Sequence, residues 1–275
     1  MNYQLHAAAN HLEVTRDGQP VGLYHTGDPF KPHWHPLRSP AGHIVTLARP
    51  HDHLHHKGLM YVLRTSRYNF MEEANLRPGE EVGRQIHLRF EDVVSAGPAV
   101  SWTEHLEWRG GAGHEPVFRE IRRQNISTAP SGGLLLAWHS SLTAVSDLSL
   151  IQSEWSRPNK DGVLINYHGL VIRLPREWCG TGNFGFAADG VPMPAADAFG
   201  TRVREATYYG AMDGPEELTF ASVTLRQHQD HRLCLRDAPF AWMTMGPTNG
   251  GPLEIAAGHV FEERYEVEIR DGKPF

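Results

Sequence analysis

The chain has 275 residues, of which 40% are hydrophobic and 21% are charged, and its formal net charge at pH 7 is -6. This composition is typical of a globular protein with a sizeable core, which excludes a disordered chain, and the length suits one domain over residues 1–275. No basic block favours nucleic acid and no stretch approaches the ~20 apolar residues that cross a bilayer, so we expect neither nucleic acid nor membrane as a partner.

The N-terminal part predicts a cytoplasmic protein that begins with a β-hairpin. Residues 1–14 lack the basic start and the apolar run of a signal peptide. Residues 11–16 and 20–25 flank Asp17-Gly18, a dipeptide that favours the tight turn between two paired strands.

Apolar and polar residues alternate in several later segments, which is typical of half-buried strands. The clearest examples are residues 100–108, 134–142 and 261–269. The 27 glycines and 19 prolines interrupt most windows that are long enough for a helix. We therefore predict an all-β protein, an antiparallel β-sandwich with little helix.

Two segments depart from this alternation. Residues 69–76 favour one or two turns of helix, and residues 175–198, rich in Gly, Pro and Ala, predict a long loop over one end of the sheets. The two cysteines, Cys179 and Cys234, are far apart and have no pairing pattern. Both are expected to be buried, reduced thiols.

Histidines are concentrated in residues 33–56, which hold seven of the 18 in the chain. Because histidine titrates near neutral pH and is the commonest metal ligand, this concentration indicates a site. In an extended segment, His51, His53 and His55 would line one face. We predict His55 and His56 as the central catalytic pair, which requires a turn or bulge before Gly58, because adjacent side chains on a strand point to opposite faces.

Further groups are predicted around this pair. His53 is expected to bind substrate or act as another acid/base group, Glu72 is expected to be the acid partner, and Glu73 is expected to be exposed. A substrate-binding role is predicted for an aromatic platform and several polar residues, namely Trp34, His35, Arg38, Asp52, Lys57, Tyr167 and His168.

The alternatives for the cluster are solvent-exposed loop histidines, or a ligand set for zinc or iron. The chain contains no G-x-S-x-G, no P-loop and no H-E-x-x-H motif. No metal ligands and no cofactor are assigned, and a metal ion is the alternative. Residues 157–159 and 166–169 offer amide, phenol and imidazole groups of the kind that hydrogen-bond sugar hydroxyls.

Three motifs resemble those of a known bacterial family. HPLRSPAG at residues 35–42 and DHLHHKGL at residues 52–59 are similar to the paired signature of the family labelled methane oxygenase PmoA, and YHGLVIR at residues 167–173 resembles its later YGGL-x-x-R segment. Leu54, Lys57 and His168 depart from the usual proline, arginine and glycine. The resemblance implies a β-sandwich similar to galactose mutarotase-like folds, and it implies site roles at the matched positions, which add Arg173 to the substrate-binding set.

These observations predict a protein that acts on a small-molecule carbohydrate. The expected chemistry is histidine-dependent acid/base catalysis on a sugar or sugar derivative, such as epimerisation, elimination or glycoside cleavage. The alternatives are a non-catalytic sugar-binding protein and a metal-dependent enzyme.

Overall fold

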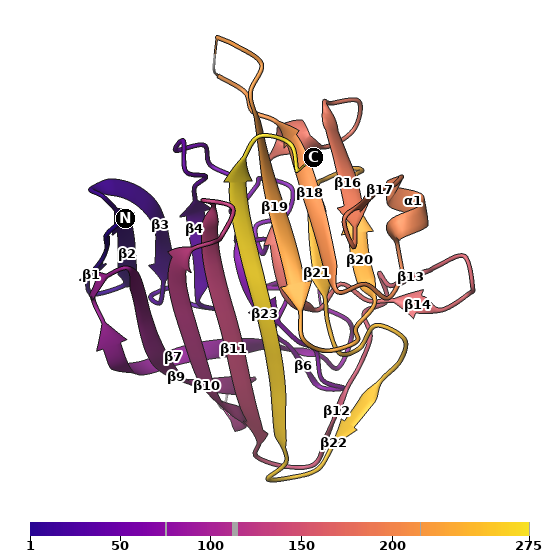
Figure 1. Cartoon of the computed structure of the whole chain (residues 1–275). Helices are drawn as coiled ribbons and strands as arrows, with labels where there is room; N and C mark the ends of the chain where they lie inside the picture. Colours follow the sequence, from indigo (N-terminus) through magenta and orange to yellow (C-terminus); the bar gives the residue numbers. More distant parts are fainter. Residues whose placement is uncertain (75, 112–114, 215, 275) are drawn as a thin grey trace.

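The computed structural model describes residues 1–74, 76–111, 115–214 and 216–274, and more than half of the chain lies in strands, most of them in two large sheets (Figure 1). The spatial order of the nine-stranded sheet is β20 (Leu233–Arg236), β21 (Trp242–Met245), β15 (Gly169–Arg173), β5 (Leu59–Val62), β4 (His33–Leu37), β3 (Gln19–His25), β2 (His11–Arg16), β1 (Tyr3–Ala7) and β8 (Ala96–Gly97).

The spatial order of the ten-stranded sheet is β17 (Val191–Pro192), β16 (Phe184–Ala188), β18 (Glu205–Ala211), β19 (Phe220–Gln227), β23 (Val260–Asp271), β11 (Leu134–Ala144), β10 (Glu115–Thr128), β9 (Ala99–Gly110), β7 (Glu81–Val94) and β6 (Tyr68–Asn69). Two small sheets pair β12 (Leu148–Leu150) with β22 (Leu253–Ile255), and β13 (Arg157–Pro158) with β14 (Leu164–Ile165).

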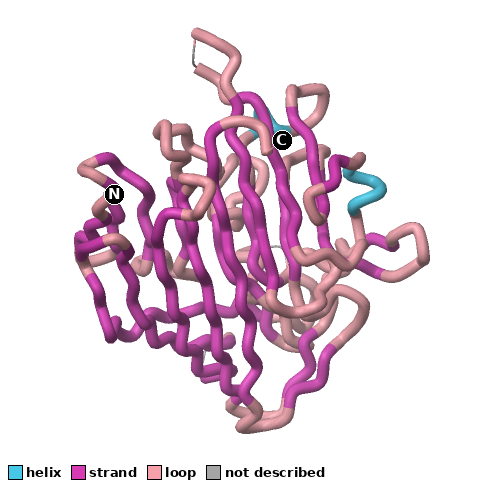
Figure 2. The backbone as a smooth tube through the Cα atoms, viewed as in Figure 1, coloured by secondary structure: helices cyan, strands magenta, loops and turns pink. Residues whose placement is uncertain are grey.

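The predicted β-sandwich with little helix is confirmed. Among the described residues, helix is confined to the 3-10 turn η1 (Arg176–Trp178) and the short α1 (Ala195–Ala198) (Figure 2). Strands of the large sheets pair antiparallel in the described chain, except for the parallel pair of β6 and β7. No helix in the described ranges has the length and apolar character that a membrane span requires.

Aromatic side chains from both sheets form the centre of the core. Trp102 and Trp138, on alternating strands of the ten-stranded sheet, are almost fully buried and meet Tyr24 from β3. Tyr24 also lies 5.3 Å from Trp34 on β4, measured between ring centroids. The alternation that predicts these strands therefore supplies the rings that join the two sheets.

The predicted N-terminal hairpin is also confirmed. β2 and β3 pair from His11 opposite His25 to Arg16 opposite Gln19. Asp17 and Gly18, between them, both have positive φ, at 49° and 79°. This is the conformation that a two-residue hairpin turn requires, and glycine and aspartate adopt it at lower cost than most residues.

The helix expected at residues 69–76 is wrong for the residues that are described, and Asn75 lies outside them. Asn69 ends β6, and its side-chain oxygen accepts the backbone N–H groups of Met71 at 2.9 Å and Glu72 at 3.0 Å. An asparagine that bonds the backbone two and three residues later forms a turn that competes with a helix. The composition of residues 69–76 alone does not reveal this local competition.

The long loop expected at residues 175–198 is also wrong, because this segment contains η1, β16, β17 and α1. β16 pairs with β18 along its whole length, and Phe186 packs on Tyr208 with ring centroids 4.3 Å apart. Gly185 leaves room for the ring of Tyr209, which a Cβ at that position would meet. Glycine and alanine here allow close packing of a strand that pairs with both β17 and β18, and they do not mark a loop.

Both cysteines are free, as predicted, but only Cys234 is buried. Burial raises the pKa of Cys234 to about 12, whereas Cys179 is half-exposed after η1. Because thiolate and access both control reactivity, we expect a thiol reagent at pH 8 to modify Cys179 in the folded protein and Cys234 only after unfolding. A count of one native thiol and two thiols in denaturant would confirm this prediction, and two rapid native thiols would contradict it.

Candidate functional site

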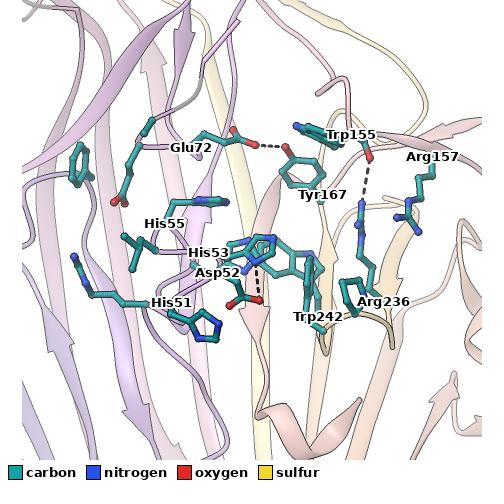
Figure 3. Close-up of a pocket in the computed structure, with 18 residues that line it drawn as sticks. His51, Asp52, His53, His55, Glu72, Trp155, Arg157, Tyr167, Arg236 and Trp242 are labelled. Carbon is teal, nitrogen blue, oxygen red and sulfur yellow. Dashed lines mark hydrogen bonds and ion pairs between the residues drawn. The ribbon is translucent and has the colours of Figure 1, made fainter. Parts of the chain in front are cut away.

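A pocket of about 810 Å³ opens on the outer face of the nine-stranded sheet, the face turned away from the ten-stranded sheet (Figure 3). On β5, Leu59 and Tyr61 belong to the core between the sheets, whereas Met60 and Val62 belong to a second apolar cluster beneath the pocket. Residues from four separate stretches, together with Phe30 and Tyr167, line it, namely Phe30, Arg49, His51, Asp52, His53, Leu54, His55, His56, Glu72, Glu73, Ala74, Trp155, Arg157, Tyr167, Arg236, Pro239, Phe240 and Trp242.

The histidine-rich segment forms turns and is not extended. The backbone N–H of His53 bonds to Pro50 and that of His56 bonds to His53, so the predicted single face of His51, His53 and His55 is wrong. The turn that the pairing of His55 and His56 requires is present, and their ring centroids are 4.6 Å apart. His53 stacks on His56 at the same separation, so the turn gathers three imidazoles at one wall.

Burial keeps two of these imidazoles neutral at pH 7. Loss of solvent lowers the pKa of His55 to about 4, and it lowers the pKa of His56 much further, with His55 adding to the effect. His56 is only 3% exposed and lies 4.5 Å from Trp242, measured between ring centroids. Its Nδ1 has no partner among the described residues. These rings can exchange hydrogen bonds with a ligand but are weak bases at neutral pH.

Glu72 is a carboxylate of the pocket that has one hydrogen-bonded oxygen and one free oxygen. The Tyr167 hydroxyl donates to one of its oxygens and lies 2.6 Å from the Ser153 hydroxyl, while the other Glu72 oxygen is buried without a partner in the described chain. Burial raises the pKa of Glu72, but the His168 ring and the bonds from Tyr167 and Asn69 outweigh it, so the net pKa is below its usual value. Glu72 is therefore an ionised carboxylate with one free oxygen.

Asp52 and His53 form a second polar pair. The Asp52 carboxylate lies 3.3 Å from Nδ1 of His53 and accepts a hydrogen bond of 2.8 Å from Arg176. Slight burial raises the pKa of Asp52, but the bond from Arg176 and the other partners outweigh it and bring the pKa to about 2. A carboxylate in this position orients an imidazole. Asp52 therefore holds the orientation of the His53 ring at one side of the pocket.

A buried quartet of charges holds the two loops that carry the histidines and Glu72. Lys57 is fully buried, and its Nζ lies 2.5 Å from Asp28 and 2.7 Å from Glu73. Lys31 lies 3.0 Å from the same Glu73 oxygen and donates to the Met71 carbonyl. Glu73 is thus a member of a buried ion network, and the expectation that it is exposed is wrong. Lys57 does not line the pocket.

Several predicted substrate-binding residues lie away from the pocket. Trp34 is fully buried in the core between the sheets, where it donates to Gln124, so it offers no platform to a ligand. His35 contacts the Thr46 hydroxyl at 3.0 Å, and Arg38 donates to the Gly42 carbonyl. Neither residue lines the pocket. The first of the two paired motifs therefore belongs to the scaffold around β4.

His168 and Arg173 lie one layer behind the pocket. His168 is fully buried, contacts the Asn166 amide at 2.8 Å and has its pKa lowered to about 4 by burial. Arg173 donates to the Ala241 carbonyl, and its guanidinium lies 4.4 Å from the centroid of Phe240, which lines the pocket. Burial lowers the pKa of Arg173 to about 10. Both residues support the pocket wall.

Several aromatic and basic residues of the pocket are not predicted from the sequence. Trp155 is 63% exposed at the pocket, and Arg236, Phe240 and Trp242 come from the C-terminal part of the chain. Trp155 stands among polar residues in SEWSRPNK, without the alternation of a strand. A tryptophan among polar residues without alternation indicates an exposed aromatic side chain, whereas nothing local distinguishes Trp242 from a core tryptophan.

The described residues contain no group of three or more His, Cys, Asp or Glu side chains arranged to hold a metal ion. The turn brings imidazole rings into stacked and edge contacts, which do not direct their nitrogen atoms to one point. The ligand-set alternative thus has no preformed coordination geometry in the described part of the chain.

One family model matches residues 11–274, and its description is a family of unknown function (DUF6807). The comparison with curated proteins gave no match, so the methane oxygenase label has no support from these comparisons. Since the match covers nearly the whole chain, including every residue that lines the pocket, this protein belongs to the DUF6807 family of unknown function.

Proposed function

We propose that this protein binds a carbohydrate in the pocket and performs acid/base chemistry on it, with Glu72 and His53 as the groups that transfer protons. The Glu72 carboxylate carries the proposal: Tyr167 holds one oxygen, and the other is buried without a partner among the described residues. A buried carboxylate with one free oxygen is suited to accept a proton from a bound molecule.

The aromatic side chains support a sugar as the bound molecule. Trp155 is 63% exposed at the pocket, and Tyr167 and Trp242 line the same pocket (Figure 3). Sugar rings have apolar faces that pack on aromatic rings and hydroxyls that bond to polar groups at the edges. His55 and His56, which are neutral at pH 7, serve as hydrogen-bonding groups of this kind.

The second proton-transfer group is His53, because its imidazole lines the pocket with Nδ1 3.3 Å from the Asp52 carboxylate. His53, His55 and Glu72 follow one another across the pocket, with His55 between the other two (Figure 3). Epimerisation, elimination and glycoside cleavage each need one group that takes a proton and another that gives one. This assignment moves the central role from the pair of His55 and His56 to Glu72 and His53.

We expect Glu72→Gln to reduce turnover about 100-fold or more, because the amide cannot accept the proton. The measurement is proton NMR of a panel of aldoses, ketoses and disaccharides incubated with the protein in D₂O. This method detects both new products and exchange of a carbon-bound proton. Glu217→Gln, at an exposed glutamate far from the pocket, is the matched control and should keep full activity.

Two outcomes would change the proposal. Full activity of a folded Glu72→Gln variant would remove Glu72 from the mechanism. Binding without turnover would favour the non-catalytic sugar-binding alternative, provided that Trp155→Ala weakens the binding.

A further inference from the structure

We propose that the sugar recognised by this pocket carries an anionic group, a carboxylate or a phosphate, and that Arg157 and Arg236 bind it. This inference rests on the proposed function and specifies its substrate class. The two arginines lie on the side of the pocket opposite Glu72 and His55 (Figure 3).

Arg236 has no anionic partner in the described chain. It extends from the outer face of β20, where its guanidinium donates to the Trp155 carbonyl at 3.3 Å and lies 5.6 Å from the centroid of Phe240. No carboxylate of the described residues lies within 4.0 Å of it. A guanidinium carries five N–H donors, and one bond to a carbonyl leaves most of them free.

Arg157 stands close enough to Arg236 to affect its ionisation. Burial lowers the pKa of Arg236, and the positive charge of Arg157 lowers it further. The side chain of Arg157, on β13, makes no hydrogen bond or ion pair with any described residue. Two neighbouring guanidinium groups repel each other, and an anion placed between them removes that repulsion and takes up their free donors.

The other charges of the pocket are already paired. Glu73 is bound by Lys31 and Lys57, and Asp52 is bound by Arg176. Glu72 is the remaining carboxylate of the lining, accepts a hydrogen bond from the Tyr167 hydroxyl, and lies on the side opposite the two arginines. The pocket therefore has a basic side whose charge no described side chain balances.

The arginines and Glu72 lie on opposite sides of the pocket, so a bound sugar would have one orientation in it. An anionic group bound by the two arginines fixes one end of the sugar, and Trp155, whose carbonyl holds Arg236, presents its ring beside them. The rest of the sugar then extends toward Glu72 and His55. Neutral sugars lack the group that the arginines bind and would be held by stacking and hydroxyl contacts alone.

The test compares matched sugars by isothermal titration calorimetry. The probes are D-glucose, D-glucuronate and D-glucose 6-phosphate, and the same three forms of D-galactose. We expect at least one anionic form to bind about 10-fold or more tightly than its neutral parent, and this preference to weaken at high salt. The comparison of uronate with sugar phosphate identifies which anion the arginines accept.

Substitutions test whether the two arginines cause the preference for anionic over neutral sugars. Arg157→Gln with Arg236→Gln should abolish the preference, whereas Arg119→Gln, which removes an exposed charge on β10 of the other sheet, should leave it unchanged. Arg157→Gln alone, at an exposed position, should reduce it and guards against misfolding of the double variant. Trp155→Ala should weaken the binding of neutral and anionic sugars alike.

Equal binding of neutral and anionic sugars would overturn the inference and leave the proposed function intact. A preference that survives in the folded double variant would also overturn it. If none of the six sugars binds, the result counts against the inference and against the proposed function together.

Discussion

Lowering the pH from 6.5 to 5 is expected to destabilise the folded protein steeply. Burial lowers the pKa of His33 to about 3 and of His35, His55 and His168 to about 4, and it lowers that of His56 still further. An unfolded chain protonates its histidines near pH 6.5. Between these values the unfolded state binds more protons than the folded state, so the free energy of unfolding falls as the pH falls.

The combined effect is large because five histidines contribute. Each loses about 1.5 kcal/mol between pH 6.5 and 5, so the total is on the order of 5 kcal/mol after allowance for partial exposure. This is comparable with the whole stability of many domains, so we expect acid unfolding near pH 5. Urea titrations at pH 7.0, 6.0, 5.5 and 5.0 measure it. Carboxylates such as Glu72, with a lowered pKa, add to the loss only at lower pH.

Single substitutions test whether the buried histidines cause the loss of stability at low pH. His168→Gln should reduce the slope of stability against pH by about one proton, whatever it does to stability at pH 7. Gln4→Ala, at an exposed position on β1 that carries no titratable group, should leave the slope unchanged. A stability that stays flat between pH 6.5 and 5 would show that these imidazoles are not held neutral.

Lys57→Met is expected to destabilise the protein by about 3–5 kcal/mol, because it leaves two buried carboxylates with too few partners. Lys57 is fully buried between Asp28 and Glu73, and Lys31 would be the remaining cation of the quartet. The unfolding midpoint in urea gives the loss. Lys160→Met, at an exposed lysine of the β13–β14 hairpin, is the matched control and should cost less than about 0.5 kcal/mol.

A second substitution separates charge from packing. If the cost comes from an uncompensated carboxylate, Asp28→Asn in the Lys57→Met background should recover part of the stability, although Asp28→Asn alone is destabilising. Equal cost for Lys57→Met and Lys160→Met would instead show that the quartet contributes little. Because the quartet anchors the loops of His55 and Glu72, the Lys57→Met variant should also lose the ordered pocket.

The sequence predicted the strands well because their signal is local. Alternation in β9, β11 and β23, and the Asp17-Gly18 turn, depend on residues that are neighbours in the chain. The expectations at residues 69–76 and 175–198 failed where a specific contact overrides composition. In one case the Asn69 side chain bonds the backbone, and in the other Phe186 packs on Tyr208.

The site was predicted in part for a similar reason. His53, His55, His56 and Asp52 lie within one turn, so their concentration in the sequence indicated a site, and the structure places all of them at the pocket. The arginine and aromatic wall could not be predicted, because strand pairing across more than 170 residues brings Arg236 and Trp242 to the pocket of the histidines. Alternation likewise could not tell that Trp34 faces the core.

The position of β15 between β5 and β21 has a consequence for how the protein emerges from the ribosome. Gly169 pairs with Val62, 107 residues earlier, and Leu170 pairs with Met245, 75 residues later. Until residues 242–245 are synthesised, one edge of β15 has no partner, and the apolar residues Met60, Val62 and Val171 lack the cover of Trp242. A nascent chain that pauses in this interval presents an unpaired strand edge beside an apolar surface, which is the kind of surface that chaperones protect.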